Sequence, residues 1–169
     1  MLVLTFQIGK DLVALDVRRV REVVPRVTLH QVAGAPHWLA GVFIYRGHVV
    51  PVIDLHRLIG VGECPTQLST RIILVPQPST PTTLISAGEK DRDEVGEEQL
   101  LGLLATQVAD IRELQLPTLA QGQLTAPAWP DLGPVLVDGP EIIHLADLGR
   151  LLPESFQRQL ALIPREVCA

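Results

Sequence analysis

The sequence predicts a mainly β protein built from many short strands. Apolar residues make up 47% of its 169 residues, but aromatic residues only 4%, so Val, Leu and Ile must fill the core. Aliphatic runs broken up by 14 prolines and 13 glycines are typical of short strands joined by sharp turns. A pattern that occurs once in each half of the chain further indicates two related lobes.

Two strands and a short helix are predicted at the N-terminus. Residues 2–8 show the period-two patterning of a strand, and residues 9–11 form a turn that leads into a partner strand over 12–15. Three valines then fall at helical spacing before Pro25 ends the element: Val17, Val20 and Val24.

The repeated pattern consists of a glycine, an apolar strand, a two-residue turn, a second apolar strand and an aspartate. It runs over residues 41–59, with its turn at Arg46-Gly47, and again over residues 133–152. Each copy predicts a β-hairpin followed by a helical turn that an aspartate caps, Asp54 in the first copy and Asp147 in the second. Coincidence is the alternative, because Gly and Leu are common in this chain.

Further strands are predicted over 71–75 and 100–108. The chain between them contains few residues suited to a core, and 89–98 hold six acidic residues against two basic ones. This composition predicts a solvated loop or insertion over about 78–98. Beyond Pro153, three apolar residues share one face of a predicted C-terminal helix: Phe156, Leu160 and Ile163.

Charge and cysteine usage limit the classes of partner and compartment. The net charge is −5 and no cluster of Lys and Arg occurs, which argues against nucleic acid. Cys64 and Cys168 fit neither a zinc pattern nor a disulfide framework, so a reducing compartment is predicted. The sequence shows no signal-peptide pattern and no apolar run long enough to span a bilayer. We therefore expect a cytoplasmic protein without direct membrane insertion.

The sequence predicts no enzyme, no metal site and no cofactor. It contains no phosphate-binding loop, no Gly-x-Ser-x-Gly elbow and no HExxH pair. Its five histidines have no metal-binding spacing, and no cysteine is close enough along the chain to complete a set. Asp54 with His56, and His144 with Asp147, are candidate acid–base pairs. Both aspartates stand where a helix cap is expected and no nucleophile accompanies them, so the capping interpretation is preferred.

Two charged residues lie within apolar stretches. Glu22 follows Val20-Arg21, and Arg46 follows Ile44-Tyr45. One interpretation is that each charge needs a partner; the other places Glu22 on a solvated helix face and Arg46 in an exposed turn. We expect the two side chains to form a partly buried ion pair, in which loss of one partner costs about 3 kcal/mol.

Several segments resemble CheW-like domains, and together they cover residues 2–153. The motifs that carry the resemblance are Phe6-Gln-Ile-Gly9, Ala14-Leu15-Asp16, Val20-Arg-Glu-Val23, Ala35-Pro36, Gly41-Val-Phe-Ile-Tyr-Arg-Gly47, Val50-Pro-Val-Ile-Asp-Leu55, Arg71-Ile-Ile-Leu-Val75 and Gly102-Leu-Leu-Ala-Thr-Gln-Val108. The resemblance implies two SH3-like barrels of five strands each, packed side by side in one domain over 1–153 and divided near 62–70. Residues 154–169 then form the C-terminal helix and tail.

The resemblance also implies a non-enzymatic scaffold that couples a CheA-type histidine kinase to the cytoplasmic tip of a methyl-accepting chemoreceptor or of a photoreceptor. It implies binding to the regulatory domain of the kinase, and a receptor-binding groove between the lobes. The matching positions on or supporting that groove are Val20, Glu22, Gly41, Arg46, Val108 and Ile111. Two alternatives are a regulatory protein that binds the kinase without a receptor, and an enzyme that uses the cleft between the lobes.

Three features depart from the family pattern, all in the second half of the chain. Thr106 stands where the family usually has Asp, and residues 76–98 are longer and more acidic than the usual connection. The segment from His144 to Asp147 spreads what is normally a tighter junction between an apolar residue and an aspartate.

Overall fold

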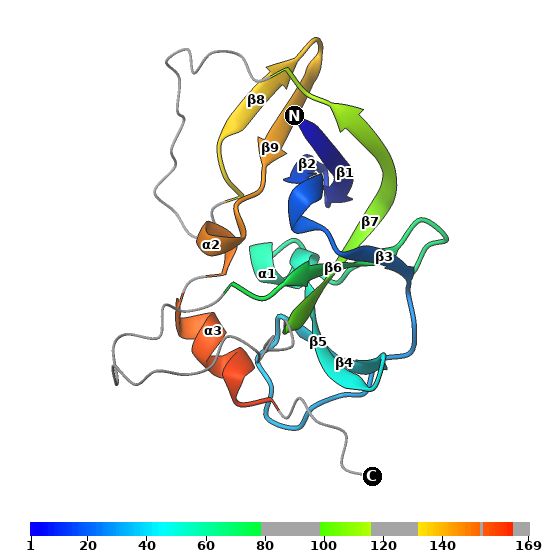
Figure 1. The fold of residues 1–169 in the computed structure, drawn as a ribbon, viewed down its shortest axis with the longest axis vertical. Coiled ribbons are helices and arrows are strands. Elements are labelled where there is room, and N and C mark those ends of the chain that lie inside the picture. The colour runs from blue at the N-terminus through cyan, green and yellow to red at the C-terminus, as the bar shows by residue number, and fades with distance from the viewer. Residues whose placement is uncertain (79–98, 116–131, 153, 164–169) are drawn as a thin grey trace, which may run out of the picture.

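The computed structural model describes residues 1–78, 99–115, 132–152 and 154–163 (Figure 1). The strands are β1 (Leu2–Ile8), β2 (Asp11–Asp16), β3 (Glu22–Pro25), β4 (Leu39–Tyr45), β5 (His48–Asp54), β6 (Arg71–Pro76), β7 (Leu100–Glu113), β8 (Val135–Asp138) and β9 (Glu141–Leu145). The helices are the 3-10 turn η1 (Val17–Arg19) and the α-helices α1 (Leu55–Ile59), α2 (Leu148–Leu151) and α3 (Glu154–Ala161). The predicted mainly β fold with short helices is therefore confirmed.

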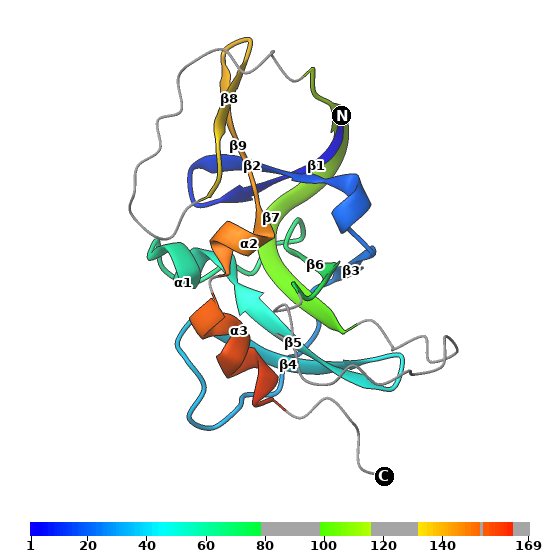
Figure 2. The same ribbon diagram turned by 60° about the vertical axis from the view of Figure 1, so that its left-hand side comes forward.

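The strands form two five-stranded lobes that share β7 (Figures 1 and 2). Lobe A contains β3, β6, the first half of β7, β5 and β4, in that spatial order. Lobe B contains the second half of β7, β1, β2, β9 and β8. Along both lobes the successive pairings are antiparallel, antiparallel, parallel and antiparallel. The two lobes therefore have the same topology, as the repeated sequence pattern predicted.

The lobes are interleaved along the chain. The β1–β2 hairpin pairs with β7 and β9, whereas β3 to β6 all belong to lobe A. The expected division near residues 62–70 falls between β5 and β6, which both pair with the first half of β7. β7 passes from one lobe to the other at a bulge, where Gln107 has φ 48° and the register with β1 shifts. A single long strand thus connects the lobes.

Both copies of the repeated pattern fold as predicted. β4 and β5 form a hairpin that ends at Asp54, whose side chain accepts hydrogen bonds from the backbone N–H groups of His56 and Arg57 at the start of α1. β8 and β9 form the second hairpin, and Asp147 accepts a hydrogen bond from Gly149 N–H at the start of α2. These carboxylates bind backbone donors that a helix end leaves without a partner.

Lobe A is nearly closed by one bridge to the segment that follows β3. His30 and Val42 exchange backbone hydrogen bonds of 2.8 and 2.9 Å. In lobe B the Arg112 guanidinium of β7 lies 2.6 Å from the Glu141 carboxylate of β9. The lobes therefore resemble barrels, although their strands do not form continuous hydrogen-bonded rings within the described residues.

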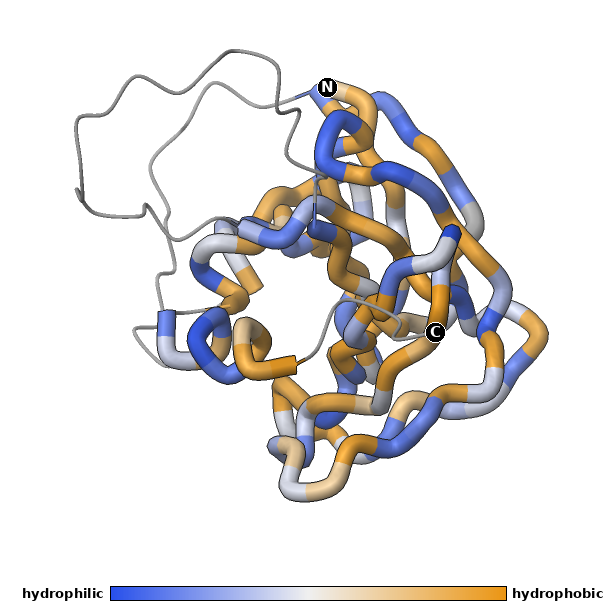
Figure 3. Tube along the Cα trace, turned by 60° about the horizontal axis from the view of Figure 1, so that its bottom comes forward, coloured by the Kyte–Doolittle hydropathy of each residue, from blue (hydrophilic) through white to orange (hydrophobic). Residues whose placement is uncertain are grey.

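The largest hydrophobic core lies between the lobes and is covered by α3. It combines Phe6 of lobe B with Ile53 of lobe A, and Leu160 of α3 is fully buried in it. The Trp38 and Phe156 ring centroids are 4.8 Å apart, which holds α3 on lobe A. Figure 3 shows apolar stretches, in orange, along much of the described chain. The predicted C-terminal helix is confirmed; among the described residues no helix is long and apolar enough to span a membrane.

The predicted helix at Val17, Val20 and Val24 is wrong. Only η1 is helical there, and Glu22 begins strand β3, which pairs with β6. Backbone pairing with a neighbouring strand overrides the helical spacing of three valines. The predicted loop over about 78–98 lies almost entirely outside the described residues.

Candidate functional site

Glu22 and Arg46 lie close together, as predicted, although 24 positions separate them in the sequence. Glu22 is the first residue of β3, and Arg46 lies in the turn between β4 and β5. Arg46 and Gly47 have φ values of 49° and 82°, which is the backbone of a tight hairpin turn. Arg46 Nη2 lies 3.5 Å from Glu22 Oε2.

Tyr45 completes this group, which we call the Glu22–Tyr45–Arg46 cluster. The Tyr45 hydroxyl donates a hydrogen bond to Glu22 Oε2, and the Arg46 guanidinium carbon lies 5.1 Å from the centre of the Tyr45 ring. The bond to the Glu22 carboxylate raises the pKa of the Tyr45 phenol. Tyr45 was not among the predicted site residues, although its place directly before Arg46 in an apolar strand was an available signal.

The cluster is more exposed than predicted. The side chain of Arg46 is 76% exposed and that of Glu22 43%. An exposed ion pair contributes about 0–1 kcal/mol, because water screens the charges and two flexible side chains lose freedom. Glu22 is partly buried, as expected, but the expected partial burial of Arg46 is wrong. The cost of losing one partner stays a prediction, and the exposure of Arg46 lowers the expected value from about 3 kcal/mol to about 1 kcal/mol or less. The arrangement presents an oriented cation beside an aromatic ring to solvent.

The apolar candidates occupy different environments. Val20 lies between η1 and β3, and Val108 lies at the bulge of β7; both are half-buried and pack against the core between the lobes. Ile111, in the lobe B half of β7, is 62% exposed. Val20 and Val108 therefore lie where the chain passes between the lobes, and Ile111 offers accessible apolar surface.

Gly41 has a structural role in lobe A. A Cβ atom at this position would lie 2.7 Å from the His30 carbonyl oxygen and 2.9 Å from Leu29 Cβ. Its φ of 148° is also a conformation that other residues rarely adopt. Gly41 thus permits the close approach of β4 to the segment that nearly closes the lobe.

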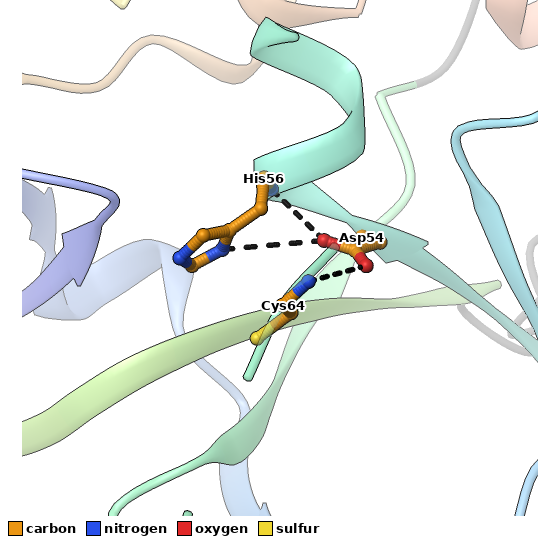
Figure 4. A group of neighbouring side chains, drawn as sticks. All are labelled: Asp54, His56 and Cys64. Carbon is orange, nitrogen blue, oxygen red and sulfur yellow. Dashed lines mark hydrogen bonds and ion pairs between the residues drawn. The ribbon is translucent and has the colours of Figure 1, made fainter. Parts of the chain in front are cut away.

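A second group, the buried trio, is formed by Asp54, His56 and Cys64 (Figure 4). Their potential ligand atoms all lie within 4.8 Å of one another. The Cys64 backbone N–H donates a hydrogen bond of 3.0 Å to Asp54 Oδ2, and Arg57 Nε lies 3.4 Å from the same oxygen. The expectation that no cysteine lies close enough was based on chain spacing and is wrong in space, because the loop after α1 folds back onto the cap.

The electrostatics of the site favour the neutral forms of His56 and Cys64. Burial lowers the pKa of His56, although the Asp54 carboxylate acts in the opposite direction. Burial, together with Asp54, raises the pKa of the Cys64 thiol to about 12. His56 Nε2 accepts a hydrogen bond of 3.0 Å from Gly9 N–H, so its proton is on Nδ1. Nδ1 faces Asp54 Oδ1 at 4.0 Å.

This arrangement fits a structural role better than metal binding or catalysis. A metal on His56 Nδ1 would move the imidazole proton to Nε2, where it would face the Gly9 N–H. A thiol with a pKa of about 12 is protonated at neutral pH and is a poor nucleophile. Asp147, in the other candidate pair, accepts a hydrogen bond from Gly149 N–H as a cap. The capping interpretation of both aspartates is therefore confirmed.

A family model described as "CheW-like domain" matches residues 2–156. "Chemotaxis protein CheW" of Treponema pallidum is 33% identical over 59 residues, which cover 35% of each chain. "Chemotaxis protein CheW" of Thermotoga maritima is 30% identical over 71 residues, 42% of this chain and 47% of the relative. The matched stretches thus span less than half of these relatives' lengths.

A solved structure shares the fold over most of the chain. The crystal structure of scaffolding protein TtCheW from Thermoanaerobacter tengcongensis superposes with a TM-score of 0.67 and 21% identity. The superposition covers 90% of this chain and 87% of that one. The agreement extends over both lobes, and the family match includes both hairpins with their capping aspartates. The chain therefore belongs to the CheW-like domain family.

Proposed function

We propose that this protein is a cytoplasmic scaffold that couples a CheA-type histidine kinase to the cytoplasmic tip of a methyl-accepting receptor. It acts by binding alone and uses no metal or cofactor. The observation that carries the proposal is the family match over residues 2–156, supported by the names of relatives that are chemotaxis and scaffolding proteins. Two lobes with one continuous core offer a rigid body on which two partners assemble.

The receptor-binding surface in this proposal contains the Glu22–Tyr45–Arg46 cluster and Ile111. An adaptor that grips a helix needs exposed apolar area together with a few oriented charges. Ile111 provides apolar area, and the Tyr45 ring and Glu22 carboxylate orient the Arg46 guanidinium. Val20 and Val108 are half-buried, so they support this surface as well as contribute to it.

The decisive test is binding of the full chain to two fragments, a kinase regulatory domain and a receptor tip. We expect the wild type to bind both, and Arg46→Glu and Ile111→Asp to lose the receptor tip while they retain the kinase domain. These two positions are more suitable than Val20, because both are exposed and substitution leaves the core intact. Val137→Asp is the matched control, since Val137 is a 70% exposed strand residue in lobe B.

Each outcome separates the possible functions. Wild type that binds the kinase domain but no receptor tip indicates the kinase-only regulatory protein. Variants that bind both fragments like the wild type place the receptor surface elsewhere. Wild type that binds neither fragment overturns the coupling function, and the remaining alternative is then an enzyme acting at the cleft.

A further inference from the structure

A pocket of about 640 Å³ opens on lobe A, away from the Glu22–Tyr45–Arg46 cluster. Its walls come from the segment after β3, over residues 25–31, and from the loop between α1 and β6, over residues 63–71. The buried Asp54 and Cys64 also line it. This volume lies in the range of small-molecule sites, about 300–1,000 Å³.

Three arginines line the pocket, and they are paired differently. Arg57 is neutralised by two carboxylates, Asp54 at 3.4 Å and Glu63 at 2.8 Å. Arg26 Nη1 donates instead to the Thr66 hydroxyl at 2.6 Å. Arg71 Nη1 donates to backbone carbonyl oxygens, among them that of Thr70 at 2.9 Å.

Among the described residues, no acidic side chain balances the positive charge of Arg26 and Arg71. Within the part of the chain that the structure describes, neither guanidinium has a carboxylate at salt-bridge distance. Their hydrogen bonds to neutral oxygens hold each side chain against the pocket wall and leave further N–H groups on each planar fork. A guanidinium held in this way is suited to an oxyanion.

Two features of the pocket select among oxyanions. Three arginines face two carboxylates, Asp54 and Glu63, so the lining has an excess of a single positive charge, which suits a monoanion better than a doubly charged phosphate. The lining also includes Val27 and Leu68, which are 40% and 96% exposed. A ligand with a hydrocarbon portion would cover this apolar surface.

We propose that this pocket binds an organic carboxylate, with the carboxylate held by Arg26 and Arg71 and the apolar portion lying against Val27 and Leu68. The carboxylate belongs either to a free organic acid or to an acidic side chain of a peptide. The assignment is independent of the receptor-binding surface proposed above, because none of the residues of that surface lines the pocket.

The test is a titration of the full ¹⁵N-labelled chain, observed through its backbone amide resonances, with hexanoate and with the blocked peptide acetyl-Leu-Glu-Leu-amide. We expect saturable shifts at Thr66, Gln67 and Thr70 for at least one of them, and none for hexanol. Binding of hexanoate alone identifies a free acid as the occupant, and binding of the peptide identifies an acidic side chain.

Two arginine variants and one control make the assignment falsifiable. Arg26→Gln and Arg71→Gln are each expected to weaken binding about tenfold, the effect of one lost charge-assisted hydrogen bond. Arg19→Gln removes the same charge from exposed η1 and is expected to change nothing. Arg26 is itself exposed, so its variant stays folded even if Arg71→Gln does not. No saturable shift, equal affinity in Arg26→Gln, or equal shifts with inorganic phosphate would overturn the proposal.

Discussion

The backbone N–H of Gly9 donates a hydrogen bond of 3.0 Å to His56 Nε2. Gly9 lies in the turn between β1 and β2 of lobe B, and His56 lies in α1 of lobe A, so this bond joins the two lobes. An imidazole accepts this bond only while it is neutral, because the imidazolium has a proton on both nitrogens. This hydrogen bond between the lobes therefore forms only while the buried His56 side chain is neutral.

The stability of the protein should fall in mild acid because of His56. Its pKa in the folded chain is below the ordinary value of 6.5, so the unfolded chain binds more protons between the two values. The contribution of neutral His56 is complete above pH 6.5 and is lost as the pH falls toward the folded-state pKa. We expect the unfolding temperature to decrease over this window, and His56→Gln to reduce the decrease.

The control for this prediction is His37→Gln, because His37 is exposed. Thermal unfolding followed by circular dichroism between pH 5 and 8 provides the measurement. An equal loss of unfolding temperature in wild type and His56→Gln would show that other groups cause the acid sensitivity.

The Cys64 thiol should be unreactive in the folded protein. It is buried and its pKa is about 12, so the thiolate that attacks alkylating reagents is scarce at pH 8. In a Cys168→Ser variant, we expect iodoacetamide to label the remaining thiol only as fast as the protein unfolds, and immediately in denaturant. Rapid labelling of the native variant would contradict the described burial.

Gly41→Ala should destabilise lobe A by about 1–3 kcal/mol, the usual cost of adding atoms to a packed core. The added methyl would contact the His30 carbonyl and move the segment that nearly closes the lobe. Gly34→Ala is the control, because Gly34 has φ 72° with nothing near its Cβ position, so only backbone strain is tested. Urea unfolding should show the larger loss for Gly41→Ala, and equal losses would leave the predicted clash without support.

Removing the charge of Arg46 should change the free energy of unfolding by less than about 1 kcal/mol, because its side chain is largely exposed. Tyr45→Phe should lower the free energy of unfolding slightly, since it removes the hydroxyl bound to Glu22. Urea unfolding of Arg46→Gln and Tyr45→Phe checks both expectations. A loss near 3 kcal/mol for Arg46→Gln would restore the interpretation as a buried pair.

Local patterns in the sequence predicted most of the elements. The hairpins with their capping aspartates follow from turn residues, alternation and caps that act over a few positions, and Asp54 and Asp147 lie where the pattern put them. The helical spacing of Val17, Val20 and Val24 predicted a helix where the structure has strand β3. This strand pairs with Ile72 to Leu74 of β6, about fifty positions further along, and no local pattern indicates that pairing.

Features that depend on distant contacts were not predictable from such patterns. The interleaving of the lobes requires β1 to pair with β7, and no local periodicity encodes a partner about a hundred residues away. The buried trio likewise depends on how the loop after α1 folds back, which places Cys64 N–H on Asp54. The ion pair of Glu22 and Arg46 was predicted from two isolated charges, but its exposure was not.

The shared strand β7 also determines the order in which the lobes complete during synthesis. β1 and β2 leave the ribosome first, yet they form only a two-stranded hairpin, which is marginally stable alone, until β7 emerges. The Met1 amine reaches its partner, the Leu114 carbonyl, only across 113 positions. All strand residues of lobe A are present once Ala105 has been added. Lobe B lacks its last strand, β9, until Leu145 has been added. The nascent chain therefore completes lobe A first, and lobe B closes when β9 pairs with β2.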